Sequence, residues 1–302
     1  MKILLTGVTG QLGHHLQRQL GQQHEIIAPQ RTTLDLADTD NIREFVRATQ
    51  PQLIIHPAAY TAVDKAETDA ALAHQINAVA PGILANEAKK LGIGLIHYST
   101  DYVFDGTLRN TDGSLSAYRE SDRVNPLNVY GKTKLAGEQA IIASGCEYLI
   151  FRTSWVYSLF GKNFLLTMLR LAKERDALRV VNDQWGAPTS AGWLSDATSQ
   201  IVKQLTSSTD AAHWWKQHTG IYHMTTAGHT SWCGFTEEIL RLAQEHGLLE
   251  RIPGLTGIPS SEYPTPAARP VNSRLDIGLL EQHFGISTPS WQTALARCLS
   301  EH

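Results

Sequence analysis

The first twenty residues constrain the fold most, because an apolar run, a glycine-rich turn and a helical pattern follow one another directly. Residues 2–6 have the composition of a buried parallel strand, and leucines at 12, 16 and 20 then recur at a helical spacing. Between them, Gly7, Gly10 and Gly13 permit a tight turn whose backbone N–H groups can approach an anion. The spacing G-x-x-G-x-x-G is not the G-x-G-x-x-G of many dehydrogenases, so an ordinary strand-to-helix turn is the alternative.

The first half of the chain continues to alternate between strand and helix patterns. Further strands are expected at 25–28, 53–56, 94–98 and 148–152, and helices at 40–49, 69–91 and 127–144. The alternation predicts an α/β fold with a Rossmann-type, doubly wound parallel sheet. A helix is also expected at 163–175, and a strand at 180–181 that joins the same sheet.

We expect a second, smaller and discontinuous α/β substrate domain. The predicted division gives residues 1–152 plus about 178–208 to the dinucleotide-binding domain. Residues of about 153–177 plus 209–302 then form the substrate domain.

Composition narrows the partners and the compartment. A formal charge of −3 and a pI near 6.5 argue against nucleic acid or a membrane surface as partner. No apolar run approaches the roughly 18 residues that span a bilayer, and the N-terminus lacks signal-peptide features. Cys146, Cys233 and Cys298 are too far apart to suggest a metal site, and reduced thiols in the cytoplasm are expected. No histidine spacing indicates a metal, and a monomer and a homodimer are both left open.

Tyr130 and Lys134 are candidates for acid–base chemistry. They lie four residues apart in a predicted helix and therefore share one face. The lysine cation should favour the phenolate, so we expect the pKa of Tyr130 to fall below its usual value of about 10. Such a tyrosine could protonate a reduced carbonyl. A solvated lysine beside a half-buried tyrosine is the plainer interpretation of the same spacing.

Polar residues follow two of the predicted strands. Ala59, Tyr60 and Thr61 come after the third strand, and Ser99 and Thr100 after the fourth. Ligands of such sheets bind beyond the carboxyl ends of the strands, so these loops should converge on the glycine turn. Ser99 and Thr100 could donate hydrogen bonds to a substrate oxygen, or could simply satisfy backbone groups in the turn.

Together these motifs resemble the extended short-chain dehydrogenase/reductases and, more closely, the dTDP-4-dehydrorhamnose reductase family. The resemblance covers nearly the whole chain in the family's order. The matching stretches are residues 59–67, 97–104, 126–138, 151–157, 182–189 and 268–273.

The resemblance implies reduction of the C4 ketone of dTDP-4-dehydro-L-rhamnose to dTDP-L-rhamnose. Tyr130 would donate the proton, Lys134 would hold the nicotinamide ribose and Thr100 would bind the developing oxyanion. Asp101 and Trp155 would touch the dTDP-sugar, although Trp155 could equally be a core aromatic. The implied cofactor-binding residues are Gly10, Gln11, Leu12, Asp35, Leu36, Ala59, Tyr60 and Thr61.

Two arginines add expectations about charge. No carboxylate follows the second strand, where Arg31 could pair with a 2′-phosphate, so NADPH is expected as the preferred cofactor with NADH tolerated. Arg31 could also be a plain surface charge. Arg269, in a proline-rich segment, is suited to a diphosphate.

Other interpretations stay open. A related epimerase or dehydratase is possible, but a dehydratase should carry an acidic pair after Thr100, where this chain has Asp101-Tyr102. A non-catalytic, NADP-binding regulatory relative is another alternative. Residues 105–122 are longer than is typical of the family, and either a mobile lid or a tolerated surface insertion would fit.

Overall fold

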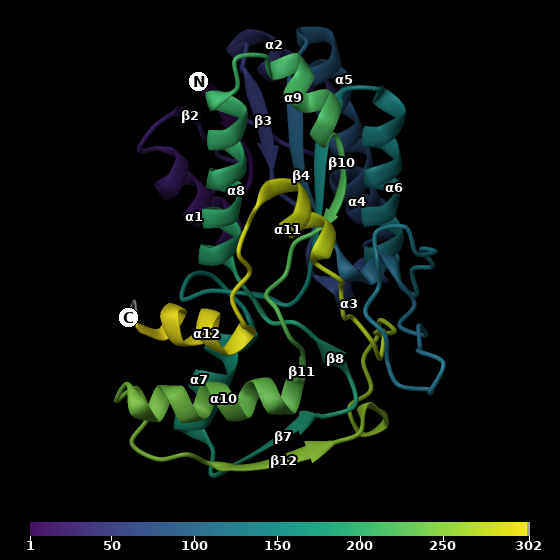
Figure 1. Cartoon of the computed structure of the whole chain (residues 1–302). Coiled ribbons are helices and arrows are strands. Elements are labelled where there is room, and N and C mark those ends of the chain that lie inside the picture. The colour runs from purple at the N-terminus through teal and green to yellow at the C-terminus, as the bar shows by residue number, and fades with distance from the viewer. Residues whose placement is uncertain (301–302) are drawn as a thin grey trace.

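The computed structural model describes residues 1–300, and its centre is a six-stranded parallel sheet (Figure 1). The strand order is β10-β5-β4-β3-β1-β2, and every neighbouring pair is parallel. The strands are β1 (Lys2–Leu5), β2 (Glu25–Ile27), β3 (Leu53–His56), β4 (Gly94–Thr100), β5 (Glu147–Thr153) and β10 (Gly220–His223). The expected doubly wound α/β fold is confirmed. The order reverses between β1 and β3, which opens a crevice at their carboxyl ends.

Helices cover both faces of this sheet. Because successive strand side chains point to opposite faces, Ile3 and Leu5 pack on one side and Leu4 on the other. One face packs against α1 (Gln11–Leu20), α8 (Ala191–Ser207), α9 (Ala211–His218) and α11 (Gly278–Phe284). The other packs against α2 (Thr39–Thr49), α5 (Ala80–Leu91) and α6 (Val129–Ser144).

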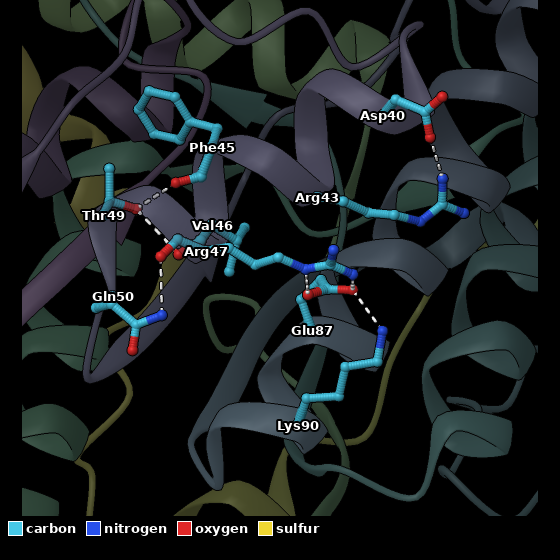
Figure 2. Close-up of polar contacts among 9 residues, drawn as sticks. All are labelled: Asp40, Arg43, Phe45, Val46, Arg47, Thr49, Gln50, Glu87 and Lys90. Atoms are coloured by element: carbon cyan, nitrogen blue, oxygen red, sulfur yellow. Dashed lines mark hydrogen bonds and ion pairs between the residues drawn. The ribbon is translucent and has the colours of Figure 1, made fainter.

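A buried carboxylate joins α2 to α5. Glu87 is 2% exposed and accepts hydrogen bonds from Arg47 Nε at 2.7 Å, Arg47 Nη2 at 2.9 Å and Lys90 Nζ at 2.7 Å (Figure 2). These two cations, Arg47 above all, hold the pKa of Glu87 down at about 2. The two hydrogen bonds from Arg47 therefore join α2 to α5, whereas the Lys90 contact lies within α5.

The helix expected at 69–91 is interrupted by a wider turn. It consists of α4 (Ala70–His74), a π-helical turn (Gln75–Val79) and α5. The turn carries Asn77, whose Oδ1 accepts from Tyr60 N at 2.8 Å and whose Nδ2 donates to Tyr60 O at 3.1 Å. The irregular turn therefore holds the loop after β3, as π-turns near functional sites often do.

The second lobe has its own core and small sheets. It contains α7 (Phe164–Glu174), α10 (Trp232–Glu245) and α12 (Trp291–Ser300), packed around Leu165, Phe235 and Leu295. The expected strand at 180–181 exists as β7 (Ala177–Val181), but it pairs with β12 (Gly254–Ile258) and does not join the main sheet. Short pairs complete the lobe: β6 (Val156–Tyr157) with β9 (Thr189–Ser190), and β8 (Trp185–Gly186) with β11 (Thr230–Ser231).

The packing divides the chain differently from the expected domain boundaries. Strand β10 and helices α9 and α11 belong to the large sheet and its core, whereas the sequence predicts them in the substrate domain. Leu178 and Val180 pack in the small lobe, whereas the sequence predicts them in the dinucleotide-binding domain. The chain thus crosses between the lobes more often than sequence periodicity indicates.

The long segment after β4 is anchored along its length. A 3₁₀ turn (Asp101–Val103) leads into it, and Tyr118 stacks on Phe104 with ring centroids 4.2 Å apart. Tyr118 N donates to Arg274 O at 2.8 Å, and Asn272 Nδ2 donates to Ser116 O at 2.7 Å. These contacts tie the segment to the proline-rich region near the C-terminus. Short turns at Val63–Ala66 (α3) and Ser260–Glu262 (η3) complete the described elements.

Candidate active site

The glycine turn after β1 is shaped by close packing. Gly7 has φ +63°, and a Cβ there would lie 2.8 Å from the Cα of Ala58 in the loop after β3. A Cβ on Gly13 would lie 2.1 Å from Gly7 O, so only glycine lets α1 approach the turn. No side chain caps α1 at Gly10, which leaves first-turn N–H groups available to an anion.

A cavity of about 480 Å³ opens beside this turn, at the reversal point of the sheet. It brings together most of the residues that the sequence singled out. These are Gly7, Gly10, Gln11, Leu12, Gly13, Arg31, Asp35, Leu36, Ala59, Thr61, Ser99, Tyr130 and Lys134. Arg31 lies 3.9 Å from Asp35 at the exposed rim.

Five predicted site residues do not line this cavity. They are Tyr60, Thr100, Asp101, Trp155 and Arg269. Tyr60 turns its hydroxyl to Asp69 Oδ2 at 2.9 Å, while its neighbours Ala59 and Thr61 do line the cavity.

Sequence reasoning also missed several lining residues. Thr153 and Val156 lie at and just after the end of β5, so the strand-end rule could have identified them. Gly161 and Lys162 come from the loop between β6 and α7, and nothing local in the sequence shows that this loop returns to the glycine turn.

Tyr130 lies in the first turn of α6, which is capped by the Asn128 side chain accepting from Gly131 N at 2.8 Å. A Cβ on Gly131 would lie 2.2 Å from Tyr102 O, so α6 approaches the 3₁₀ turn closely. Burial raises the pKa of Tyr130 to about 12, and a hydrogen bond with Thr100 opposes that rise. The expected fall in the pKa of Tyr130 is therefore wrong for this structure.

Lys134 does not oppose that rise in the pKa of Tyr130, because its ammonium has other partners. Its ammonium is buried and donates to Tyr98 O at 2.7 Å, and it lies 3.0 Å from His97 Nε2. Burial lowers the pKa of Lys134 to about 7, with the Glu138 carboxylate opposing the shift. Two of the three ammonium protons thus have partners in the protein, and neither partner is the Tyr130 hydroxyl.

Two buried histidines continue this polar chain. The rings of His97 and His56 stack with centroids 5.2 Å apart, and His56 Nδ1 lies 2.7 Å from Thr6 Oγ1. Burial, reinforced by the charge of Lys134, lowers the pKa of both histidines below their usual range, so both are neutral near pH 7. A neutral His97 can accept a hydrogen bond from Lys134.

The turn after β4 holds a hydroxyl and a buried acid side by side. Thr100 Oγ1 donates to Asp101 Oδ1 at 2.9 Å and accepts from Tyr102 N at 3.2 Å. Burial raises the pKa of Asp101 to about 6. Ser99 behaves differently from expectation, because its hydroxyl donates to Glu138, which is itself paired with Arg152 at 2.7 Å.

The two predicted substrate contacts in the second half, Trp155 and Arg269, do not line the cavity. Trp155 has φ +47°, and its ring stacks on Trp232 with centroids 3.5 Å apart and an interplanar angle of 6°. A Cβ on Gly186 would lie 2.6 Å from the Trp155 ring. Arg269 Nη2 lies 2.8 Å from Asp64 Oδ2, which connects the proline-rich segment to the large lobe.

Residues 1–300 lack two kinds of feature. No helix there is long and apolar enough to cross a membrane. Nor does that part of the chain contain a group of three or more histidine, cysteine, aspartate or glutamate side chains placed to hold a metal ion.

Comparison with known proteins points to one group of enzymes. The RmlD substrate binding domain family matches residues 1–302. The chain is 41% identical to a dTDP-4-dehydrorhamnose reductase of Burkholderia thailandensis, over 100% of this chain and 99% of that protein. It is similar to the crystal structure of such a reductase from Clostridium acetobutylicum (TM-score 0.87, 37% identity, 100% and 99% coverage). A Bacillus anthracis reductase in complex with NADP gives a TM-score of 0.87, 34% identity and 100% coverage of both chains.

Proposed function

The chain belongs to the RmlD substrate binding domain family, and on that premise we propose that it is an NAD(P)H-dependent dTDP-4-dehydrorhamnose reductase. It reduces the C4 ketone of dTDP-4-dehydro-L-rhamnose to give dTDP-L-rhamnose. The observation that carries the proposal is the presence of Tyr130 and Lys134 in the wall of the same cavity as the glycine turn.

The cavity suits a dinucleotide. Gly7 and Gly13 leave no room for side chains, so backbone N–H groups are exposed to an anion, and the α1 N-terminus adds a favourable dipole. Arg31 supplies a cation on the β2 side, which favours NADPH and tolerates NADH. The remainder of the site is lined by Gly10, Gln11, Leu12, Asp35, Leu36, Ala59 and Thr61. Tyr60 does not line the cavity, but its backbone N–H donates to Asn77 and so holds the loop that carries Ala59 and Thr61. When bound, the reduced cofactor supplies the hydride that attacks the carbonyl carbon.

Tyr130 is the proton donor in this proposal. With its pKa at about 12, the phenol is fully protonated near neutral pH and can give its proton to the substrate oxygen as negative charge develops there. The O–H bond of Tyr130 breaks and the new C4 hydroxyl gains the proton. Thr100 would stabilise the same oxygen by turning its hydroxyl, which donates to Asp101 Oδ1 at 2.9 Å, toward the substrate.

Lys134 completes the acid site. Two of its protons point to His97 and Tyr98 O, so the third is available to the cavity that the side chain lines. That proton would bind the nicotinamide ribose. The positive charge then stabilises the tyrosinate left after proton transfer.

The substrate residues are assigned by the same reasoning. Arg269 would exchange Asp64 for the sugar-nucleotide diphosphate, because a guanidinium binds either oxyanion group in a forked geometry. Asp101 and Trp155 would contact the sugar nucleotide beside Thr100 and Trp232. Ser99 has the weakest support, since its hydroxyl already serves Glu138.

A coupled assay tests the proposal. Oxidation of NADPH that requires dTDP-4-dehydro-L-rhamnose and yields dTDP-L-rhamnose supports the reductase. Binding of NADPH without turnover would instead indicate the non-catalytic relative. A product that retains the ketone, or one formed without net oxidation of NADPH, would indicate an epimerase or dehydratase.

A further inference from the structure

Hydrogen bonds of one side chain, Gln11, connect the loop from 158 to 163 in the second lobe to the glycine turn. Gln11 begins α1, and its Oε1 accepts from Asn163 Nδ2 at 2.8 Å and from Ser158 Oγ at 3.1 Å. Its Nε2 donates to Val156 O at 3.3 Å. One side chain of the turn therefore satisfies three groups of the other lobe.

The loop is also fixed from its own side. Asn163 caps α7 by accepting from Leu166 N at 3.0 Å, and its Nδ2 donates to Ser158 O at 2.8 Å. Gly161 has φ +77°, and a Cβ there would make an ordinary van der Waals contact, 3.5 Å from Gln11 Cγ. Because the loop is held at both ends, the backbone of Lys162, between Gly161 and Asn163, has a defined position.

That residue is Lys162, and it lines the same cavity as the glycine turn. No ion pair involving Lys162 occurs within residues 1–300, and its side chain is exposed. The other two cations of the cavity have different surroundings. Arg31 lies near Asp35 on the β2 side, and Lys134 is buried and donates to Tyr98 O.

We propose that Lys162 is a cofactor-binding residue, delivered by the second lobe to the pyrophosphate held at the glycine turn. The inference rests on the proposed function, because it takes the cavity to be the dinucleotide site. The backbone N–H groups of the turn orient the pyrophosphate but carry no net charge. An ammonium close to them neutralises part of the charge of the pyrophosphate and makes cofactor binding depend on the position of the second lobe.

This role has a distinct signature. The pyrophosphate is common to NADPH and NADH, whereas only NADPH carries the 2′-phosphate. Loss of Lys162 should therefore weaken both nucleotides by the same factor, and loss of Arg31 should weaken NADPH selectively. Salt should reduce the Lys162 effect, because the side chain is exposed.

The experiment measures binding without turnover. NADPH and NADH are titrated into wild type, Lys162→Gln, Lys162→Arg, Arg31→Gln and the matched control Lys173→Gln, with nucleotide fluorescence as the readout. Lys173 lies in the last turn of α7 and does not line the cavity. Lys162→Gln should raise both dissociation constants by about 5- to 20-fold at low salt and by less at 0.5 M NaCl. Lys162→Arg should restore most of the affinity, and Lys173→Gln should change nothing.

A double variant tests how Lys162 is positioned. If Gln11 holds the loop, Lys162→Gln should cost less affinity in a Gln11→Ala background than in wild type. Two results would overturn the inference: affinities for both nucleotides within twofold of wild type in Lys162→Gln, or a loss confined to NADPH. Failure of wild type itself to bind either nucleotide would instead count against the proposed function.

Discussion

The Nζ of Lys134 lies 3.0 Å from the Nε2 of His97, and both side chains are buried. Burial lowers the pKa of His97, so the imidazole is neutral near pH 7. It can therefore accept a hydrogen bond from the Lys134 ammonium and does not repel it. It is thus a positioning residue for the proposed acid site, and it acts through Lys134.

His97→Leu should shift the pH profile. Removing the acceptor destabilises the Lys134 ammonium, so the pKa of Lys134 should fall from about 7 to about 6. The charged Glu138 and the neutral His56 remain near the ammonium in this variant. Because the charged form predominates below its pKa, the alkaline limb of kcat/KM should move to lower pH. His97→Gln, which keeps an acceptor, should restore the limb. An unchanged limb in a folded His97→Leu protein would contradict the role.

Tyr130→Phe should remove catalysis and leave binding intact. The ring keeps its packing against Tyr102, but the proton donor is lost, so kcat should fall by about 10²- to 10⁴-fold. The NADPH dissociation constant, from fluorescence titration, should stay within a few-fold of wild type. Retention of wild-type turnover would exclude Tyr130 as the donor.

Gly13→Ala should abolish nucleotide binding. Its Cβ would lie 2.1 Å from Gly7 O, so the turn must move away from the position that presents its N–H groups. Gly145→Ala is the matched control: Gly145 has φ +67° and open space around it. The control should cost about 1 kcal/mol of stability and no NADPH affinity. Equal loss of affinity in both variants would argue against a local effect.

Glu87 should make stability depend on acid pH. Its pKa is about 2 in the folded protein and 4.5 ordinarily, so its contribution is complete above 4.5 and is lost as pH falls through about 2. Glu87→Gln should lower the unfolding free energy by about 2 kcal/mol at pH 7, a figure reduced for the half-exposed Arg47 and Lys90. Urea unfolding at pH 7 and pH 3 should show the difference between the two proteins shrinking at pH 3. A constant difference would contradict the linkage.

The sequence predicted the parts of the molecule that local periodicity controls. The strand at 53–56, the glycine turn and the helix carrying Tyr130 all lie where apolar spacing placed them. Long-range pairing was less accessible. The pattern at 180–181 identifies a strand but not its partner, and β12 lies more than seventy residues away.

The electrostatics of the site could not be predicted from spacing. Tyr130 and Lys134 share a helical face as expected, yet burial raises the pKa of the phenol, and the ammonium turns to His97 and Tyr98 O. These effects depend on how closely α6 packs on β4, which only the folded chain defines. Lys162 was missed for the same reason, since the contacts of Gln11 that place it span about 150 residues.

Trp155 links a torsion angle to an aromatic stack. Its left-handed backbone is unfavourable for a bulky side chain by about 1–2 kcal/mol, so the stack on Trp232 and the fit against Gly186 must hold the ring in place. Trp155 lies between β5 of the large lobe and β6 of the small one. If the sugar nucleotide binds Trp155 as proposed, a ligand that displaces this indole from Trp232 will also act on the backbone that connects the two lobes.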